Sequence, residues 1–170
     1  MSEYKIELEA LGKRARTAAR RLSVLPTDVK DQALAAMAAA LRARTAEILE
    51  ANRTDIEIAR KGGLTAAFID RLYLDPGRVE AMAEGIDVVL LLPDPVGETI
   101  RAWRRPNGMT IQKVRVPIGV IAIIYESRPN VTADAACLCF KTGNAVILRG
   151  GSEALHSNLA VAAAMMGAAG

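Results

Sequence analysis

PIGVIAIIYESRPNVT, residues 117–132, and NAVILRGGSE, residues 144–153, carry the strongest structural signal in the chain. Residues 120–124 and 145–148 are short apolar runs rich in β-branched side chains, a pattern typical of parallel strands that are buried on both faces. Residues 132–141 are mostly apolar or small, and Gly143 or Asn144 supplies the left-handed residue that ends a helix. The pattern predicts a βαβ unit whose first strand lies in the middle of a parallel sheet.

A polar loop follows the first predicted strand at its carboxyl end, where open α/β sheets bind their ligands. Pro129 prevents further ladder pairing and favours an extended Arg128. Glu126, Ser127, Arg128 and Asn130 therefore gather at this end of the strand. Hydrogen bonds that close the loop are the simplest interpretation of these residues, but their position favours a role in binding. Arg128 is a candidate ligand for a phosphate of either a substrate or a cofactor.

The second predicted strand also ends in residues suited to binding. Arg149 is a cation, and Gly150 and Gly151 allow a ligand to approach the backbone closely. Ser152 and Glu153 then begin a helix, whose free N–H groups favour anions and hydroxyl groups. The two loops together predict a clamp for ribose and phosphate.

Composition indicates one ordinary globular core, because 51% of the 170 residues are hydrophobic and 24% are charged. The net charge of +3 comes largely from cations among alanines near the N-terminus, and aromatic residues make up only 4% of the chain. Few side chains are thus available to stack on bases, so we expect no nucleic-acid partner.

Cys137 and Cys139 fall in the predicted crossover helix, about 200° apart on a helical wheel, and are badly placed to form a disulfide. Their apolar surroundings favour core packing over a reactive thiolate. No signal peptide opens the chain and no apolar stretch reaches the ~18 residues of a membrane span. We therefore expect a cytoplasmic protein without a membrane partner, and we predict no metal site.

The first 92 residues have helical periodicity and predict five helices that cover a sheet. Thr27, Thr45 and Thr65 are candidate N-caps, and Asp75 followed by Pro76 is a fourth. Residues 93–116 predict a two-stranded ribbon around the turn Pro-Asn-Gly at 106–108, either packed on this domain or, as we favour, paired with another subunit. Residues 117–170 form the predicted nucleotide-binding βαβα part. Its last helix should lead into a third parallel strand, so we expect the front portion of a larger enzyme.

Four segments occur in the order and spacing of one family: PIGV at 117–120, YESRPNVT at 125–132, KTGNA at 141–145 and RGGSEA at 149–154. They resemble the gamma-glutamyl phosphate reductases, also called glutamate-5-semialdehyde dehydrogenases, of the aldehyde dehydrogenase superfamily. Weaker likeness extends back through NGM at 107–109 and ILEANRTD at 48–55, so the resemblance covers essentially the whole chain. It implies an α/β fold in which N-terminal helices cover an incomplete Rossmann-like parallel sheet.

The resemblance also implies a reaction, the NADPH-dependent reduction of L-glutamyl 5-phosphate (gamma-glutamyl phosphate) to L-glutamate 5-semialdehyde and phosphate in proline biosynthesis. A thiolate attacks the acyl phosphate, phosphate leaves, and hydride reduces the thioester. In that family the nucleophilic cysteine lies in a later catalytic domain whose motif is absent here, so we expect this chain alone to be inactive. The family further implies a homo-oligomer, and association with glutamate 5-kinase is an open possibility.

Site residues follow from the same resemblance. Asn130 matches the asparagine near the reacting carbonyl, where an amide N–H stabilises a developing oxyanion. Arg149 matches a position that is commonly lysine in the superfamily, and its guanidinium is compatible with a bidentate grip on the 2′-phosphate of NADP. Glu153 resembles the acceptor of the ribose hydroxyls. The full set expected to bind the cofactor is Ser127, Arg128, Arg149, Gly150, Gly151, Ser152 and Glu153.

Two other functions stay open. An aldehyde-oxidising member of the superfamily is disfavoured because such relatives usually place an aromatic residue before the asparagine that Asn130 matches. A non-enzymatic helical interaction or nucleic-acid-binding module is suggested by the basic, alanine-rich front of the chain. His156 has no carboxylate partner in its motif, so a structural role is the simpler interpretation. Asn52 is expected to be a satisfied buried amide, and Trp103 to lie on a ribbon face.

Overall fold

The computed structural model describes residues 3–168. Five helices come first: α1 (Glu3–Leu22), α2 (Thr27–Ala43), α3 (Thr45–Lys61), α4 (Ala66–Leu72) and α5 (Pro76–Leu91). The strands β1 (Thr99–Arg104), β2 (Thr110–Val114) and β3 (Val120–Ile124) follow. Then come α6 (Asn130–Lys141), β4 (Ala145–Arg149), a 3₁₀ turn (Ser152–Ala154) and α7 (Leu155–Ala168). The five predicted front helices, the ribbon and the βαβ unit are confirmed; residues 169–170 of the predicted βαβα part lie outside the described residues.

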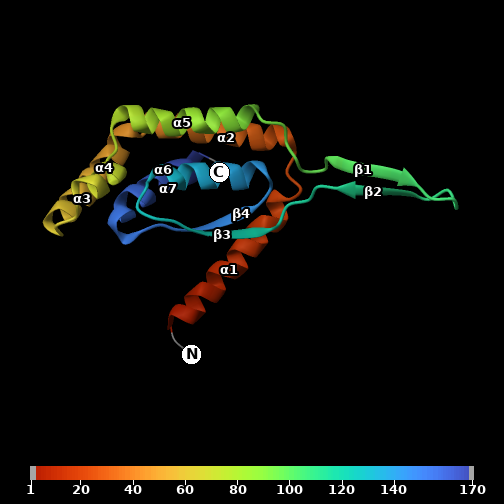
Figure 1. Cartoon of the computed structure of the whole chain (residues 1–170), viewed down its shortest axis with the longest axis horizontal. Coiled ribbons are helices and arrows are strands. Elements are labelled where there is room, and N and C mark those ends of the chain that lie inside the picture. The colour runs from red at the N-terminus through yellow and green to blue at the C-terminus, as the bar shows by residue number, and fades with distance from the viewer. Residues whose placement is uncertain (1–2, 169–170) are drawn as a thin grey trace.

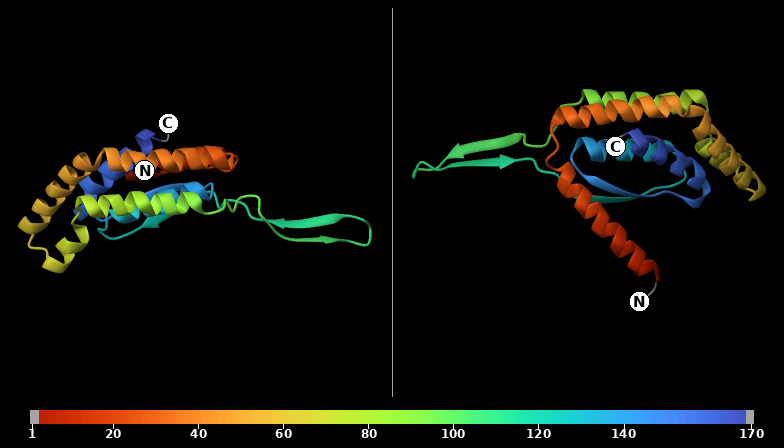
Figure 2. Two further views of the ribbon diagram at one scale, coloured as in Figure 1. Left: turned by 90° about the horizontal axis from the view of Figure 1, so that it is seen from above. Right: turned by 180° about the vertical axis from the view of Figure 1, so that it is seen from behind.

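The body of the molecule has three layers. Helices α2 and α5 lie side by side, α6 and α7 lie beneath them, and the β3–β4 pair lies beneath α6 and α7 (Figure 1). One end of helix α1 packs against β4, and its N-terminal part extends away from the body (Figure 2). Tyr4 and Leu8, near the start of α1, are therefore exposed. None of the helices within residues 3–168 has the length and apolarity that crossing a bilayer would require.

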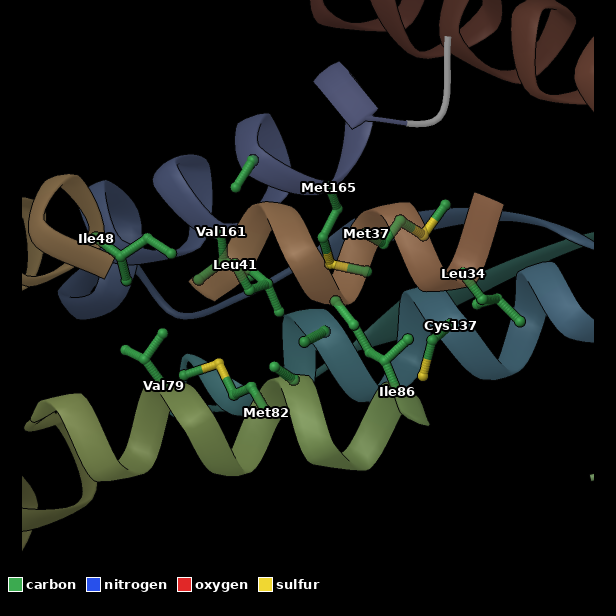
Figure 3. Packing of buried hydrophobic residues seen from close by; sticks show 14 of the residues in the cluster. Leu34, Met37, Leu41, Ile48, Val79, Met82, Ile86, Cys137, Val161 and Met165 are labelled. Atoms are coloured by element: carbon green, nitrogen blue, oxygen red, sulfur yellow. The ribbon is translucent and has the colours of Figure 1, made fainter. Parts of the chain in front are cut away.

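The core lies between the helices. Leu34 and Leu41 of α2, Val79 of α5 and Val161 of α7 are fully buried and pack in one cluster with Met165. Figure 3 shows these side chains converging from the three helices. Burial of a large aliphatic side chain stabilises a fold by about 1.5–3 kcal/mol, so this cluster dominates the hydrophobic stabilisation of the chain.

Two of the four predicted helix caps are present. The side chain of Thr65 accepts a hydrogen bond from the N–H of Phe68, and that of Asp75 accepts one from the N–H of Arg78. The prediction was wrong for Thr27, whose hydroxyl donates to Asp94 instead, 2.9 Å away. It was also wrong for the next threonine, residue 45, because a single residue separates α2 from α3 and the hydroxyl bonds back to the last turn of α2.

Strands β3 and β4 pair in parallel, with Val120 opposite Ala145 and Ile124 opposite Arg149. The crossover helix α6 ends at Lys141, and Gly143, two residues later, has a φ of +72°, the left-handed stop that the sequence predicted. The expectation of a central strand buried on both faces is wrong for the described residues. There β3 has only β4 as a strand partner, and Ile124 is 78% exposed. An apolar run predicts a strand, but burial depends on what else covers it.

The ribbon formed by β1 and β2 projects from the body in all three views (Figures 1 and 2). Its strands are antiparallel, and nearly every residue of both is exposed. Trp103 lies on an exposed face of the ribbon, as predicted, with the guanidinium of Arg101 over its ring. The sequence left open whether the ribbon packs on this domain or pairs with another subunit. Within residues 3–168, the ribbon does not pack on the rest of the domain.

Two buried lysines anchor the base of the ribbon. Lys30 of α2 forms an ion pair with Asp94 and donates to the carbonyl of Lys141, 3.3 Å away. Lys141 at the end of α6 in turn pairs with Asp31 at 2.6 Å and donates to the carbonyl of Leu90. Burial alone would raise the pKa of Asp94, but hydrogen bonds from Lys30 and its other donors outweigh burial and lower it. The network fixes α2, α5 and α6 against the segment that leads into β1.

Candidate functional site

The loops that follow β3 and β4 meet on one rim of the molecule, as the sequence predicted. The N–H of Tyr125 donates to the carbonyl of Arg149 at 3.1 Å, which continues the parallel ladder by one residue. The hydroxyl of Ser127 donates to Oε2 of Glu153 at 2.7 Å. Ser127 is buried, so this bond fixes the first loop against the start of the helical segment after β4.

A second chain of hydrogen bonds joins the same two regions. The phenol oxygen of Tyr125 lies 2.6 Å from Oγ1 of Thr132. The Thr132 hydroxyl in turn donates to Oδ1 of Asn158 at 3.0 Å. Thr132 is in the first turn of α6 and Asn158 is in the first turns of α7. Because Thr132 has one hydrogen to donate and uses it on Asn158, the Tyr125 hydroxyl is the donor of the shorter bond. Hydrogen bonds within the chain therefore hold the two loops of the rim together.

The diglycine is required by packing of the two loops. A Cβ on Gly151 would overlap Oγ of Ser127 and lie 2.7 Å from Oε2 of Glu153. A Cβ on Gly150 would overlap the amide of Asn158 and lie 3.1 Å from the ring of Tyr125. The sequence interpretation assigned the missing side chains to close approach by a ligand. The structure fills that space with the chain's own side chains.

A cleft of about 420 Å³, here called the rim cleft, opens between the two loops. Its lining consists of Phe68, Ile124, Tyr125, Glu126, Ser127, Arg149, Gly151 and Glu153. Arg149 is exposed, and the hydrogen bond from Ser127 lowers the pKa of Glu153, so that its carboxylate is charged at neutral pH. Apolar surface, a cation and a carboxylate thus border one space. Ser152 is exposed in the 3₁₀ turn next to it.

The same loop after β3 also borders a different cleft, of about 460 Å³, here called the α4–α5 cleft. Its lining consists of Asp70, Arg71, Tyr73, Leu74, Arg78, Ala81, Met82, Arg128, Pro129, Asn130 and Asp134. The structure therefore divides the predicted site residues between two spaces. Ser127, Arg149, Gly151 and Glu153 line the rim cleft, whereas Arg128 and Asn130 line the α4–α5 cleft. The sequence predicted only that helices α4 and α5 cover the sheet, so it did not indicate that their residues line a cleft.

Asn130 is the first residue of α6, and its side chain is exposed. Its Nδ2 donates to Oδ2 of Asp134, one turn later, at 3.2 Å. One N–H of the amide is left for another acceptor, because an amide nitrogen carries two donors. Burial raises the pKa of Asp134, although the bond from Asn130 acts in the opposite direction.

Both cysteines are buried and free in the described structure, as predicted. Figure 3 shows Cys137 packed beside Leu34 and Ile86. Burial, with a smaller effect of the Asp134 charge, raises the pKa of Cys137 to about 11, and burial also raises that of Cys139. Neither thiol has the accessible, electropositive surroundings that a nucleophile requires.

Helix α3 fixes the beginning of α7 from the opposite side. The buried carboxylate of Asp55 accepts hydrogen bonds from the backbone N–H groups of His156 and Ser157, and from the Ser157 hydroxyl at 2.6 Å. Its Oδ1 also lies 2.7 Å from Nδ1 of His156, so the histidine has a carboxylate partner that its own motif does not contain. Asn52, one turn earlier, is a satisfied buried amide bonded to Ser157 and to the backbone of Leu72 and Leu74.

The link between Asp55 and His156 spans 101 residues, and no periodicity indicates it. The available signal was a pair of polar residues, Asn52 and Asp55, on the buried face of an amphipathic helix. His156 is exposed and lines neither cleft. Its bond to Asp55 gives it the structural role that was predicted, with α3 as the partner element.

Comparison with known proteins identifies the relatives. None of the protein-family models compared matches the chain. Gamma-glutamyl phosphate reductase of Rhodopseudomonas palustris (strain BisB5) is 58% identical over 156 residues, which are 92% of this chain and 36% of that protein. The crystal structure of gamma-glutamyl phosphate reductase from Thermotoga maritima is 47% identical with a TM-score of 0.90, and the match covers 92% of this chain and 38% of that one.

A more distant structure shows the fold alone. A putative aldehyde dehydrogenase from Bacillus subtilis is 19% identical with a TM-score of 0.71, over 95% of this chain and 34% of that one. This likeness confirms the predicted α/β, aldehyde-dehydrogenase-like architecture. The chain spans a little over a third of the length of the reductases that it matches. Over that span, its sequence and its structure are similar to those of gamma-glutamyl phosphate reductases.

Proposed function

We propose that the chain supplies the cofactor side of a gamma-glutamyl phosphate reductase, which reduces L-glutamyl 5-phosphate to L-glutamate 5-semialdehyde and phosphate with NADPH in proline biosynthesis. The observation that carries the proposal is the rim cleft, in which the loops after two adjacent parallel strands bring Arg149, Glu153 and Ser127 together. Ligands of open α/β sheets bind at this end of the strands. The high identity to reductases over the same residues supports the assignment.

The lining of the rim cleft fits a dinucleotide phosphate. Ile124 and Phe68 provide apolar surface for a base, and exposed Arg149 can pair with a phosphate. Glu153 uses one carboxylate position to accept from Ser127 and keeps others for ribose hydroxyl groups. Gly150, Gly151 and Ser152 shape and border this part of the rim. The preference for NADPH over NADH is assigned to Arg149, because a guanidinium can hold a 2′-phosphate by two parallel bonds.

The residues of the chain have separate tasks in this proposal. When bound, NADPH supplies the hydride that reduces the acyl group to the aldehyde. The free N–H of Asn130 stabilises charge on the oxygen of the reacting carbonyl. Asp134 accepts from the other N–H and so orients the amide. Cys137 and Cys139 are packing residues, so we assign the attacking thiolate to a cysteine outside this chain.

We assign residues 1–92 to a helical layer, 93–116 to an oligomerisation element and 117–170 to the nucleotide-binding part. The ribbon supports the second assignment, since its strands are exposed and leave edges that a second copy can pair with. Arg128 lines the α4–α5 side of its loop, so we assign it to an anionic group of the substrate rather than to a cofactor phosphate. A cytoplasmic location is proposed from the two buried, free thiols. An association with glutamate 5-kinase belongs to the proposal through the family resemblance alone.

The test is a titration of the chain with NADPH and with NADH, followed by nicotinamide fluorescence. We expect Arg149→Ala to weaken NADPH binding about 10- to 100-fold, the loss typical of a bond between charged groups, and to change NADH binding far less. Arg60→Ala is the matched control, because Arg60 is exposed on α3 and lines neither cleft. Equal losses for both nucleotides would remove the 2′-phosphate role, and absence of NADPH binding would contradict the proposed function.

A further inference from the structure

The α4–α5 cleft begins where the proposed reaction occurs. Asn130 lies in its lining, and the preceding residues of the same loop line the rim cleft. A molecule in the α4–α5 cleft can therefore present one end to Asn130 while the rest extends between α4 and α5. A volume of about 460 Å³ is in the range of small-molecule sites.

Two cations in this cleft are available to a ligand. Arg71 at the end of α4 and Arg128 in the loop after β3 are exposed, and no side-chain hydrogen bond or ion pair engages either one within residues 3–168. Arg78 differs, because it is already used inside the protein. Its guanidinium donates to the carbonyls of Asp70 and Tyr73 at 2.6 and 2.7 Å and to the Asp70 carboxylate at 3.1 Å. Arg78 shapes the wall, and the other two arginines remain for a bound anion.

The cleft is also lined by two carboxylates, of which only Asp134 has no cationic partner among the described residues. Oδ2 of Asp134 accepts from Asn130, whereas Oδ1 has no hydrogen-bond donor among the described residues. The other carboxylate of the lining, Asp70, is paired with Arg78. Leu74 and Met82 supply apolar surface between these polar groups. A ligand that satisfies the cleft has an anionic group, a cationic group and a short apolar stem.

We infer that the α4–α5 cleft binds the α-amino-acid end of the substrate, with Arg71 and Arg128 holding the α-carboxylate and Asp134 holding the α-ammonium group. The inference rests on the proposed function, in which the substrate is an L-glutamyl compound, and adds how its amino-acid end is recognised. The methylene groups lie along Leu74 and Met82. An acyl phosphate without an amino-acid head makes no such pair of contacts, so this cleft sets the specificity for glutamyl compounds.

The experiment uses the intact chain and L-glutamate as the probe, with binding measured by calorimetry and by amide chemical shifts. We expect L-glutamate to shift amides at Arg71, Arg128 and Asp134. Arg71→Gln and Arg128→Gln should each raise its Kd about 10- to 100-fold, as loss of a charged hydrogen bond predicts. Arg53→Gln is the matched control, since Arg53 is exposed on α3 and outside the cleft, and it should leave the Kd unchanged.

A second probe isolates Asp134. Glutarate has both carboxylates of glutamate but lacks the ammonium group, so the unaltered chain should bind it at least about 10-fold more weakly than L-glutamate. Asp134→Asn should remove this discrimination while affecting glutarate little. A general loss of folding would weaken both probes together, and circular dichroism of the variant detects it independently. Unchanged discrimination in a folded Asp134→Asn variant would overturn the role of Asp134.

NADPH binding, measured on the same samples, separates the two proposals. If NADPH binds and L-glutamate does not, or if the arginine variants leave the Kd of L-glutamate unchanged, the inference is overturned and the cofactor role stands. If L-glutamate binds in this cleft and NADPH does not bind, the proposed function is overturned while the amino-acid site is supported. Failure of both ligands overturns both proposals.

Discussion

The helical core and the β3–β4 pair reach very different degrees of burial. Leu34 and Leu41 of the core have no exposed surface, whereas Ile124 at the end of β3 is 78% exposed. Helices α2, α3, α5, α6 and α7 contribute side chains to the core, but the strand pair has helices near it and no further strand within the described residues. The helices therefore supply most of the buried apolar contacts, whereas the loop after β3 contributes to the lining of both clefts.

The rim nevertheless depends on the helices. Asp55 and Asn52 of α3 fix the beginning of α7, and the 3₁₀ turn that carries Glu153 precedes α7 directly. Ser127 then holds the other loop against Glu153. The comparison shows that preorganisation of the candidate site comes from polar bonds to buried helices, because the two-stranded sheet alone is only marginally stable.

The largest expected loss of stability comes from shortening a side chain in the core, compared with the same kind of change in a strand. Leu41→Ala is expected to lower the free energy of unfolding by about 2–5 kcal/mol, because it leaves a cavity at a fully buried position. Ile124→Ala, a matched removal of an aliphatic side chain, should change it by less than about 0.5 kcal/mol. Urea denaturation measures both. Similar losses would mean that the strand pair is part of the stabilising core.

A smaller loss of stability is expected when the link from α3 to the rim is removed. Asp55→Ala leaves the N–H groups of His156 and Ser157 without their acceptor and is expected to cost about 2–4 kcal/mol. Hydrogen exchange of those two amides should accelerate more than exchange in α5. Glu57→Ala, at an exposed position on the same helix, serves as the control and should be nearly neutral. Unchanged exchange at the start of α7 in the Asp55 variant would contradict the anchoring role.

The smallest effect concerns the contact between the two loops. Gly151→Ala forces the Ser127 hydroxyl away from Glu153, and we expect a loss of about 1–2 kcal/mol from that charged hydrogen bond. Gly12→Ala should instead raise the free energy of unfolding by about 0.5–1 kcal/mol, because Gly12 lies inside α1 with no atom within 4 Å of an added Cβ. Thermal unfolding of the two variants gives the comparison. A neutral Gly151→Ala would show that the loops do not pack as described.

Local chemistry predicted the elements of this fold well. Strands β3 and β4, the stop at Gly143, the caps at Thr65 and Asp75 and the ribbon turn all follow from a few adjacent residues. The failed caps depended on how the chain enters a helix, which residue types alone do not determine. The exposure of β3 could not be predicted either, because apolar composition does not reveal which neighbours are present.

The candidate site was predicted to a similar extent. The meeting of the loops around Ser127 and Glu153 followed from parallel-strand topology, since both loops leave the same edge of a sheet. The division of Asn130 and Ser127 between two clefts did not, because it depends on where α4 and α5 pack. The bond between Asp55 and His156 was equally inaccessible, since it joins helices far apart in the sequence.

The most direct test of the central claim is an amide chemical-shift titration of the isotopically labelled chain with NADPH. The account predicts that the largest shifts fall on Ser127, Gly150, Gly151 and Glu153, from both loops at once, and that saturation follows a single Kd. Shifts confined to one loop, or centred on the ribbon or the helical core, would contradict a cofactor site built where the two strand ends meet.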